Sequence, residues 1–309
     1  MKKAFPKTAK SATLIGYYGL FFWTIAPVLV SSVRTIPTFQ VLSTALGISF
    51  TSTAIFLTYT KRWTLLKQPI RLWIIGILAV YGNDVLYIAA FKYAPPAQAD
   101  LISYLWPILV ILFSGLLPKE KFTLKHLLAG LLGFTGIYVL LSDRAEFTHF
   151  QNEYAIGYLL ALGSALVWSI YTLTARHYGQ TRSEAIGIYC GVGMLCSLLT
   201  HYHLETFVPP TSLQWLAMIT MGLTTQGLAY FCWDYGVKRG DFKFLNVLSY
   251  SNPIVSVLLL IVFGYAEPSF ALLAACVLIT LGGMMASISW PRRLKQAQAF
   301  KSVFLSKIS

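Results

Sequence analysis

A series of long apolar runs constrains this chain more than any other feature, because about 20 mainly apolar residues are needed to cross a bilayer as a helix. Ten such runs, bounded by basic residues, prolines or polar clusters, lie at 11–30, 38–59, 70–91, 97–116, 124–142, 155–175, 184–202, 211–235, 243–263 and 269–290. Apolar residues make up 56% of the chain and charged residues 11%, which excludes a soluble enzyme, a disordered chain and a small disulfide-rich domain. We predict an all-α integral membrane protein with ten transmembrane helices.

The basic residues predict the orientation of these helices, because Lys and Arg stay preferentially in cytoplasmic loops. The two ends of the chain and every second connection carry 21 of the 24 basic residues, and the alternate connections carry only Arg34, Lys92 and Arg144. This alternation requires an even number of spans, with the N- and C-termini both cytoplasmic. It also explains the net charge of +13 without a nucleic-acid partner.

No residue pattern indicates a metal, a cofactor or a disulfide. The four cysteines all fall inside predicted spans, where they are expected to pack as small apolar residues. His201 and His203 are two residues apart at a helix end and point in different directions. There is also no phosphate-binding loop for ATP. We therefore expect neither a metal site nor a cofactor.

The two halves of the chain resemble each other, which indicates an internal duplication. Four short matches occur in the same order in the two halves: 23–25 with 168–170, 83–87 with 226–230, 103–107 with 249–253, and Gly136 with Gly282. Because each half has five helices, the second half must enter the membrane from the opposite side. Such inverted repeats are typical of secondary transporters, whose substrate binds between the repeats near the midplane.

The duplication predicts the organisation of the whole chain. We expect a cytoplasmic N-terminus, a first five-helix repeat, a periplasmic linker, a second five-helix repeat and a basic cytoplasmic tail, at residues 1–10, 11–142, 143–154, 155–290 and 291–309. No soluble segment or coiled coil indicates an obligate partner besides the lipid bilayer, so we expect a monomer.

Two symmetric polar stripes mark helix faces that we expect to line a central cavity, since unsatisfied polar groups are costly in hydrocarbon. The stripes have the spacing of one helix face and consist of Asp100, Ser103, Tyr104 and Pro107 in one half and Asn246, Ser249, Tyr250 and Pro253 in the other. Pro107 and Pro253 are predicted to kink their helices. The alternative is that the Ser and Tyr side chains only hold helices together.

Asp84 is the residue that is most costly to place in a membrane. It lies about 20 Å into its run, at 1.5 Å per residue, and no basic residue lies deep in any run to pair with it. Its carboxyl is expected to be protonated part of the time, or hydrogen-bonded to Asn83, a tyrosine or water. We interpret it, with Asp100, as a candidate coupling site or an anchor for a substrate amino group; a purely structural role is the alternative. Asp234, four residues before Lys238, is expected to form a surface ion pair.

Deep aromatic and amide side chains complete the candidate substrate site. Aromatic residues form 15% of the chain, and those within the spans are suited to a planar ligand. The predicted substrate-binding residues are Trp23, Asn83, Asp84, Tyr87, Tyr104, Trp106, Trp168, Tyr171, Gln226, Tyr230, Tyr250 and Asn252. Gly130, Gly133 and Gly136 favour close helix packing.

The topology and the duplication resemble the drug/metabolite transporter superfamily, specifically its EamA-type members, over nearly the whole chain. The segment Tyr104-Leu105-Trp106-Pro107 is similar to the same segment of YddG-type aromatic amino acid exporters. The resemblance implies a bacterial inner-membrane protein that exports amino acids or similar metabolites. It also implies a cavity built by the first, third, fourth, sixth, eighth and ninth helices.

Three classes of function remain open from the residues alone. A secondary transporter that works by alternating access agrees with the topology; amino acid cargo, with aromatic amino acids favoured, is what the resemblance implies. Other cargo, such as cationic drugs, sugars or nucleotide-linked metabolites, is an alternative, because the spans offer carboxylates but no buried Arg or Lys for a substrate carboxylate. An integral membrane enzyme is a remote alternative, since no nucleophile–base pair or metal cluster lies at membrane depth.

Overall fold

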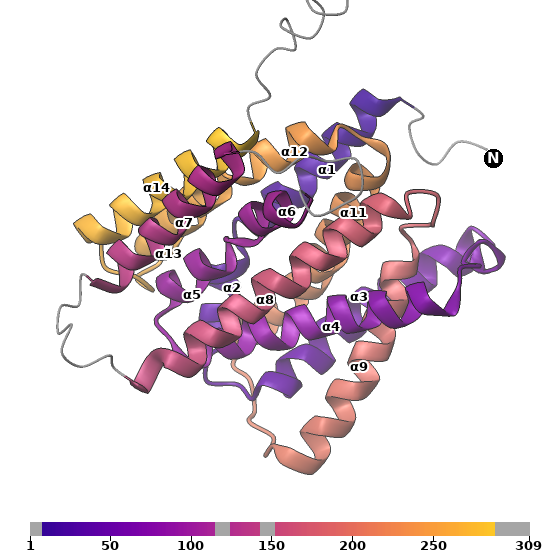
Figure 1. Cartoon of the computed structure of the whole chain (residues 1–309). Coiled ribbons are helices and arrows are strands. Elements are labelled where there is room, and N and C mark those ends of the chain that lie inside the picture. The colour runs from indigo at the N-terminus through magenta and orange to yellow at the C-terminus, as the bar shows by residue number, and fades with distance from the viewer. Residues whose placement is uncertain (1–7, 115–123, 143–151, 288–309) are drawn as a thin grey trace, which may run out of the picture.

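The computed structural model describes residues 8–114, 124–142 and 152–287, and within these ranges every regular element is a helix (Figure 1). The elements are α1 (Ala9–Trp23), α2 (Ala26–Ser32), α3 (Thr38–Tyr59), η1 (Trp63–Leu65), α4 (Ile70–Tyr93), α5 (Pro96–Ser103), α6 (Trp106–Ser114), α7 (Leu124–Ser142), α8 (Asn152–His177), α9 (Ala185–Leu204), α10 (Ser212–Thr220), η2 (Met221–Leu228), α11 (Ala229–Arg239), α12 (Phe242–Ser249), α13 (Asn252–Val262) and α14 (Phe270–Ser287). The predicted all-helical fold is confirmed for these residues.

Within the described residues, seven helical segments are long and apolar enough to cross a membrane. They cover Ala9–Ser32, Thr38–Tyr59, Ile70–Tyr93, Pro96–Phe113, Glu153–His177, Ala185–Leu204 and Phe242–Val262. Two apolar helices, Gly130–Leu140 and Phe270–Met285, are shorter. The predicted run at 211–235 forms α10, η2 and α11, so the count of ten spans stays a prediction.

Parts of the predicted organisation lie outside the described residues. The N-terminal segment is described only from residue 8, and the predicted linker only from residue 152. The predicted basic tail, residues 291–309, lies entirely outside them.

Three of the predicted runs are interrupted shortly before a proline. Pro27, Pro107 and Pro253 each occupy the second position of a helix, namely α2, α6 and α13. Proline has no N–H to donate to the preceding turn and its ring collides with it, so a new helix begins there. The break ahead of Pro27 was not predicted from the sequence, and the corresponding residue of the second half, Thr172, lies within the uninterrupted α8.

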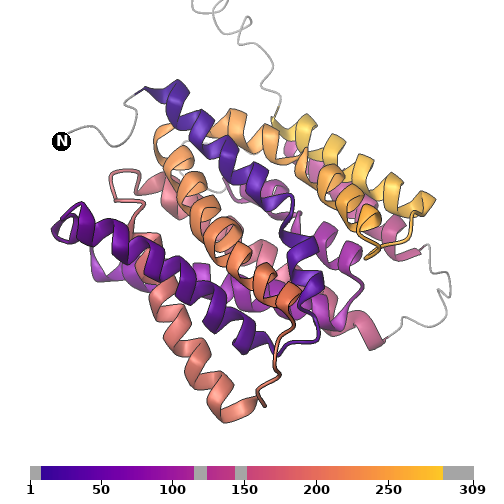
Figure 2. The same cartoon turned by 180° about the vertical axis from the view of Figure 1, so that it is seen from behind.

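The closest helix pairs join the two halves of the chain. α1 packs along α11, α3 along α9, α4 along α8, and α7 along α14. The described start of α1 and end of α14 lie at one face of the bundle, with the connections from α3 to α4, α8 to α9 and α11 to α12 (Figures 1 and 2). The connections from α2 to α3, α9 to α10 and α13 to α14 lie at the opposite face.

Glycines allow two of these pairs to approach closely. A Cβ at Gly236 of α11 would lie 2.5 Å from the Cα of Gly16 of α1. A Cβ at Gly136 of α7 would lie 3.2 Å from the Ala275 carbonyl oxygen of α14. Small residues that let backbones meet are typical of helix packing in membranes.

Candidate functional site

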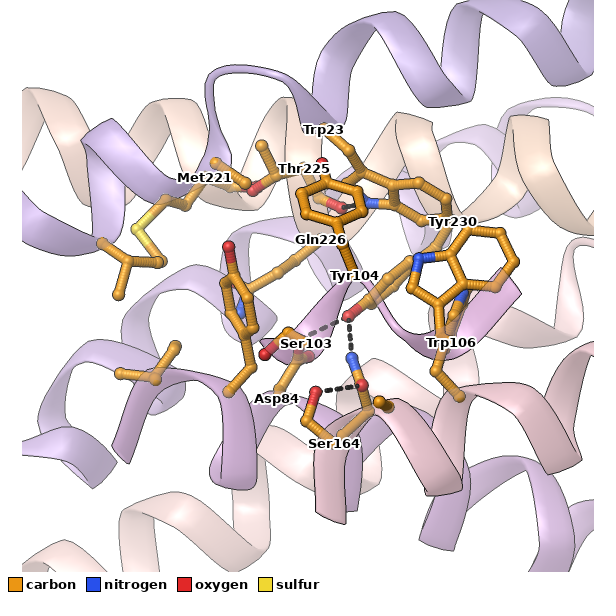
Figure 3. Close-up of a pocket in the computed structure, with 17 residues that line it drawn as sticks. Trp23, Asp84, Ser103, Tyr104, Trp106, Ser164, Met221, Thr225, Gln226 and Tyr230 are labelled. Carbon is orange, nitrogen blue, oxygen red and sulfur yellow. Dashed lines mark hydrogen bonds between the residues drawn. The ribbon is translucent and has the colours of Figure 1, made fainter. Parts of the chain in front are cut away.

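The predicted site residues converge on a cavity of about 80 Å³ between α1, α2, α4, α5, α6, α8, η2 and α11 (Figure 3). It is lined by residues from both halves of the chain. Nine of the twelve predicted substrate residues are among the lining: Trp23, Asn83, Asp84, Tyr87, Tyr104, Trp106, Trp168, Gln226 and Tyr230. The sequence pattern therefore located the cavity, while the role of each residue stays a prediction.

Three aromatic side chains from different helices form one wall of the cavity. Trp168 of α8 stacks on Tyr230 of α11, with ring centroids 5.0 Å apart and planes 27° apart. Trp23 of α1 meets Trp168 edge-on at 5.3 Å and Tyr230 at 5.6 Å. A stacked pair with a third ring at its edge is a favourable arrangement for aromatic groups, and it leaves apolar ring surface for a ligand.

Four polar side chains form a directed hydrogen-bond relay that ends at Asp84. The Ser164 hydroxyl donates to Asn83 Oδ1 at 2.8 Å, and Asn83 Nδ2 donates to the Tyr230 hydroxyl at 3.1 Å. The Tyr230 hydroxyl in turn donates to Asp84 Oδ1 at 2.5 Å. Each hydrogen bond polarises the next. The relay, whose members come from three helices, therefore strengthens the hydrogen bond that Asp84 Oδ1 accepts.

Two buried acceptor atoms at the cavity have no hydrogen-bond donor among the described residues. They are Asp84 Oδ2 and Gln226 Oε1. Both side chains line the cavity, and the two residues are only 3% and 4% exposed to solvent. The Gln226 side chain lies beside the Asp84 carboxyl. Buried polar atoms are almost always paired, so the cavity lacks a donor at this point.

A π-helical segment, η2, positions Gln226 at the cavity. The wider turn leaves carbonyls free to accept from side chains: Trp23 Nε1 donates to Thr225 O at 3.0 Å, and Ser49 Oγ donates to Gln226 O at 3.1 Å. π-helical turns are frequent at functional sites. No pattern in the sequence predicted this segment.

Three predicted site residues lie outside the cavity lining. The Tyr171 hydroxyl donates to Asp234 Oδ1 at 2.8 Å, and Asn252 Nδ2 donates to Leu20 O at 2.9 Å. The ring of Tyr250 packs against Gly283 of α14. The ninth predicted helix, α12 and α13, therefore supplies no lining residue, and the cavity is less symmetric than the two polar stripes suggested.

Asp100 is fully buried behind the cavity wall. Its two oxygens accept from the Tyr87 hydroxyl at 2.9 Å and from Ser256 Oγ of α13 at 2.6 Å. Because Tyr87 lines the cavity, this carboxyl connects the cavity to the second half of the chain without itself being exposed to it.

The expected surface pair of Asp234 and Lys238 is present but is not at the surface. Lys238 Nζ lies 2.6 Å from Asp234 Oδ2, and their side chains are 6% and 0% exposed. The prediction of exposure was wrong because α8 covers this end of α11: Tyr171 of α8 donates to Asp234, and Arg176 of α8 donates to Val237 O. An i,i+4 pair at a helix end is usually solvent-exposed, and the sequence does not show what packs on it.

Sequence reasoning missed two polar lining residues, Ser164 and Thr225. Ser164 precedes Trp168 by one helical turn, so the two side chains share a face of α8; that spacing was a usable signal. Thr225 lies beside Gln226 in the π-helical segment, and α-helical periodicity does not predict that both reach the cavity.

Both halves of the chain match one known family. Residues 10–142 and 155–288 each match the EamA-like transporter family. The chain belongs to this family. As an EamA-like transporter it moves a small molecule rather than catalysing a reaction. The seven long apolar helices in the described part of the chain make it a multi-pass membrane protein.

Individual relatives cover nearly the whole of this EamA-like transporter. The aromatic amino acid exporter YddG of Ancylobacter novellus is 39% identical over 281 residues, which is 90% of this chain and 97% of the relative. The exporter of the same name from Escherichia coli (strain K12) is 24% identical over 292 residues, with 90% and 97% covered. A crystal structure of a 38% identical protein covers 90% of this chain and 97% of that chain, with a TM-score of 0.74.

Proposed function

We propose that this EamA-like transporter is a secondary exporter of amino acids, with aromatic amino acids favoured, and that it works by alternating access. The observation that carries the proposal is the wall of Trp23, Trp168 and Tyr230 on a cavity between the two halves. Ring-on-ring packing contributes about 0.5–1.5 kcal/mol beyond buried area, which favours aromatic cargo over alanine. The name of the Ancylobacter novellus relative supports the same cargo.

We further propose ten spans in two inverted five-helix repeats, 11–142 and 155–290, with both termini in the cytoplasm. The pairing of α1 with α11 and of α4 with α8 supports a pseudo-twofold relation. In the first pair, the first helix of repeat one meets the third helix of repeat two, and in the second pair the third helix of repeat one meets the first helix of repeat two, as a twofold exchange of the repeats requires. The alternation of basic residues supports the orientation. The proposed transport unit is a monomer whose two repeats both line the cavity.

The size of the cavity supports alternating access. At about 80 Å³ it is well below the roughly 300–1,000 Å³ of typical ligand pockets. The helices must therefore separate to admit an amino acid. Trp233 closes the cavity toward the face where α11 ends, since its ring meets Trp106 at 5.1 Å and Trp23 at 5.8 Å.

We propose that Asp84 couples transport to protons. Its carboxyl lines the cavity and has one oxygen free for a proton or for a substrate group. If proton and cargo compete for this oxygen, each leaves when the other binds, which is the requirement for exchange. Asp100 is proposed to assist by holding Tyr87 against the cavity through a contact to α13.

Uptake of labelled tryptophan, phenylalanine, threonine and alanine into proteoliposomes, with and without an acidic interior, tests this function. We expect saturable uptake of the aromatic amino acids, accelerated by the acidic interior because protons leave as cargo enters. In Asp84→Asn the acceleration is lost, whereas in the matched control Glu267→Gln, an exposed loop residue, it is kept. No uptake above empty liposomes for any of the four would contradict the proposed cargo.

A further inference from the structure

We propose that the unpaired oxygens Asp84 Oδ2 and Gln226 Oε1 form a recognition site for a primary ammonium group, and that the transporter therefore also carries arylalkylamines that have no carboxylate. This inference rests on the proposed function, because it assigns the polar end of the same cavity. It extends the cargo from amino acids to aromatic monoamines.

The unpaired polar atoms of the cavity are acceptors, so they favour a ligand that carries hydrogen-bond donors. Asp84 Oδ1 already accepts from Tyr230. Among the described residues, no donor lies in hydrogen-bond geometry to Oδ2 of the same carboxyl or to Oε1 of Gln226, although the Gln226 amide lies close enough to act on that carboxyl. Both residues are more than nine-tenths buried and adjacent to one another. An ammonium group carries three donors and no acceptor, so it can satisfy both oxygens at once.

A carboxylate finds no equivalent partner in the lining. None of the residues that line the cavity, all of them described, is Lys, Arg or His. Three lining donors are committed elsewhere: Trp23 Nε1 to Thr225 O, Asn83 Nδ2 to Tyr230, and Ser164 Oγ to Asn83. Other lining donors, such as the Tyr104 hydroxyl and the Gln226 amide, are neutral. The carboxylate of an amino acid is thus tolerated in the cavity rather than required for binding.

The aromatic wall favours the same ligand class. Trp23, Trp168 and Tyr230 present rings around the relay that ends at Asp84. Tyr230 belongs to both the aromatic wall and the relay. The aromatic ring of an arylalkylamine would therefore pack on the wall while its ammonium group lies beside Asp84. Tryptophan and tyrosine rings also attract cations through their π-faces.

Competition by three indole compounds separates the roles of the two charged groups. Uptake of labelled tryptophan into proteoliposomes is measured against unlabelled tryptophan, tryptamine, which has only the ammonium, and indole-3-propionate, which has only the carboxylate. We expect tryptamine to compete at least as well as tryptophan and indole-3-propionate to be about 10-fold to 100-fold weaker, the range of one or more lost charged hydrogen bonds. Labelled tryptamine itself is expected to enter the vesicles.

Variants assign the effect to the two oxygens. Asp84→Asn and Gln226→Met are expected to weaken competition by tryptamine by about tenfold or more, while indole-3-propionate changes little. The matched control Gln98→Met replaces a glutamine outside the cavity and is expected to leave all three compounds unchanged. If Asp84→Asn is not monodisperse in detergent, Gln226→Met alone carries the test, because it keeps the relay to Asp84.

The outcomes distinguish this inference from the proposed function. If tryptophan is transported and indole-3-propionate competes better than tryptamine, the ammonium site is refuted and the proposed exporter stands. If tryptamine is transported and tryptophan is not, the ammonium site stands and the amino acid cargo is refuted. If neither compound is transported, both proposals fail.

Discussion

At the scale of single residues, three buried carboxyls differ in what balances them. Asp234 has an ion-pair partner in Lys238, Asp100 accepts from two hydroxyls, and Asp84 keeps one oxygen free at the cavity. A fully paired carboxyl stabilises the packing around it, whereas a free oxygen facing a cavity is available to a ligand or a proton. This difference is why we assign coupling to Asp84 and a structural role to Asp234.

The buried ion pair gives a prediction for stability. Lys238→Met leaves the Asp234 carboxyl without its cation, and we expect a loss of about 3–5 kcal/mol because an uncompensated charge stays buried. The double variant Asp234→Asn/Lys238→Met removes both charges and is expected to recover most of that loss. Thermal unfolding of the detergent-purified protein measures both. Equal losses in the single and the double variant would contradict a buried, coupled pair.

Polar residues that lie deep in an apolar run could be recognised from the sequence. The environment of a residue that depends on which helix packs against it could not. Asp84, Asn83 and Gln226 were found because polar groups within a span must face a cavity or another helix. The burial of Asp234 was missed because it follows from the position of α8. The placement of Tyr250 against Gly283 likewise depends on α14.

At the scale of elements, close crossings between the halves hold the cavity together. The four main helix pairs each join one half to the other, and glycines at the crossing of α1 with α11 remove the side chains that would separate them. Helix positions followed from the apolar runs, and the breaks at Pro107 and Pro253 followed from proline chemistry, whereas the break ahead of Pro27 was not predicted. The π-helical η2 was not predicted either, because apolar runs carry no signal for a wider turn; its carbonyls accept from Trp23 of α1 and Ser49 of α3.

The crossing of α1 and α11 predicts the effect of a single methyl group. Gly236→Ala places a Cβ 2.5 Å from the Cα of Gly16, and we expect overpacking to cost about 1–3 kcal/mol. The matched control is Gly82→Ala in α4, where a Cβ would meet nothing within 4 Å and where alanine is expected to be neutral or to stabilise the helix by about 0.5–1 kcal/mol. Thermal unfolding compares them, and equal midpoints would refute the close crossing.

At the scale of the whole molecule, the charge alternation and the duplication predict two inverted repeats, and the main helix pairs join the two halves of the chain. The described start of α1 and end of α14 share a face (Figures 1 and 2), as an even number of spans requires. The sequence could not show how far the cavity is closed, because closure depends on how α11 docks against α1 and α8 rather than on any local pattern.

Membrane orientation is tested by single cysteines in a background without the four native ones. Lys67 and Thr206 are both exposed and lie in connections that we place on opposite sides of the membrane. With a membrane-impermeant maleimide, we expect Thr206→Cys to be labelled in intact cells and Lys67→Cys only after permeabilisation. The reverse pattern would contradict the proposed cytoplasmic termini.

The central claim is that one aromatic-lined site is exposed alternately to the two sides of the membrane, and counterflow of tryptophan tests it most directly. Proteoliposomes loaded with excess unlabelled tryptophan are diluted into a trace of labelled tryptophan. We predict a transient accumulation of label above its equilibrium level, because each unlabelled tryptophan that leaves exposes the site on the outside, where it binds labelled tryptophan. This overshoot is expected to be absent with alanine-loaded vesicles and in Trp168→Ala. Entry of label to equilibrium with no overshoot would show a channel-like pathway instead and would contradict the account.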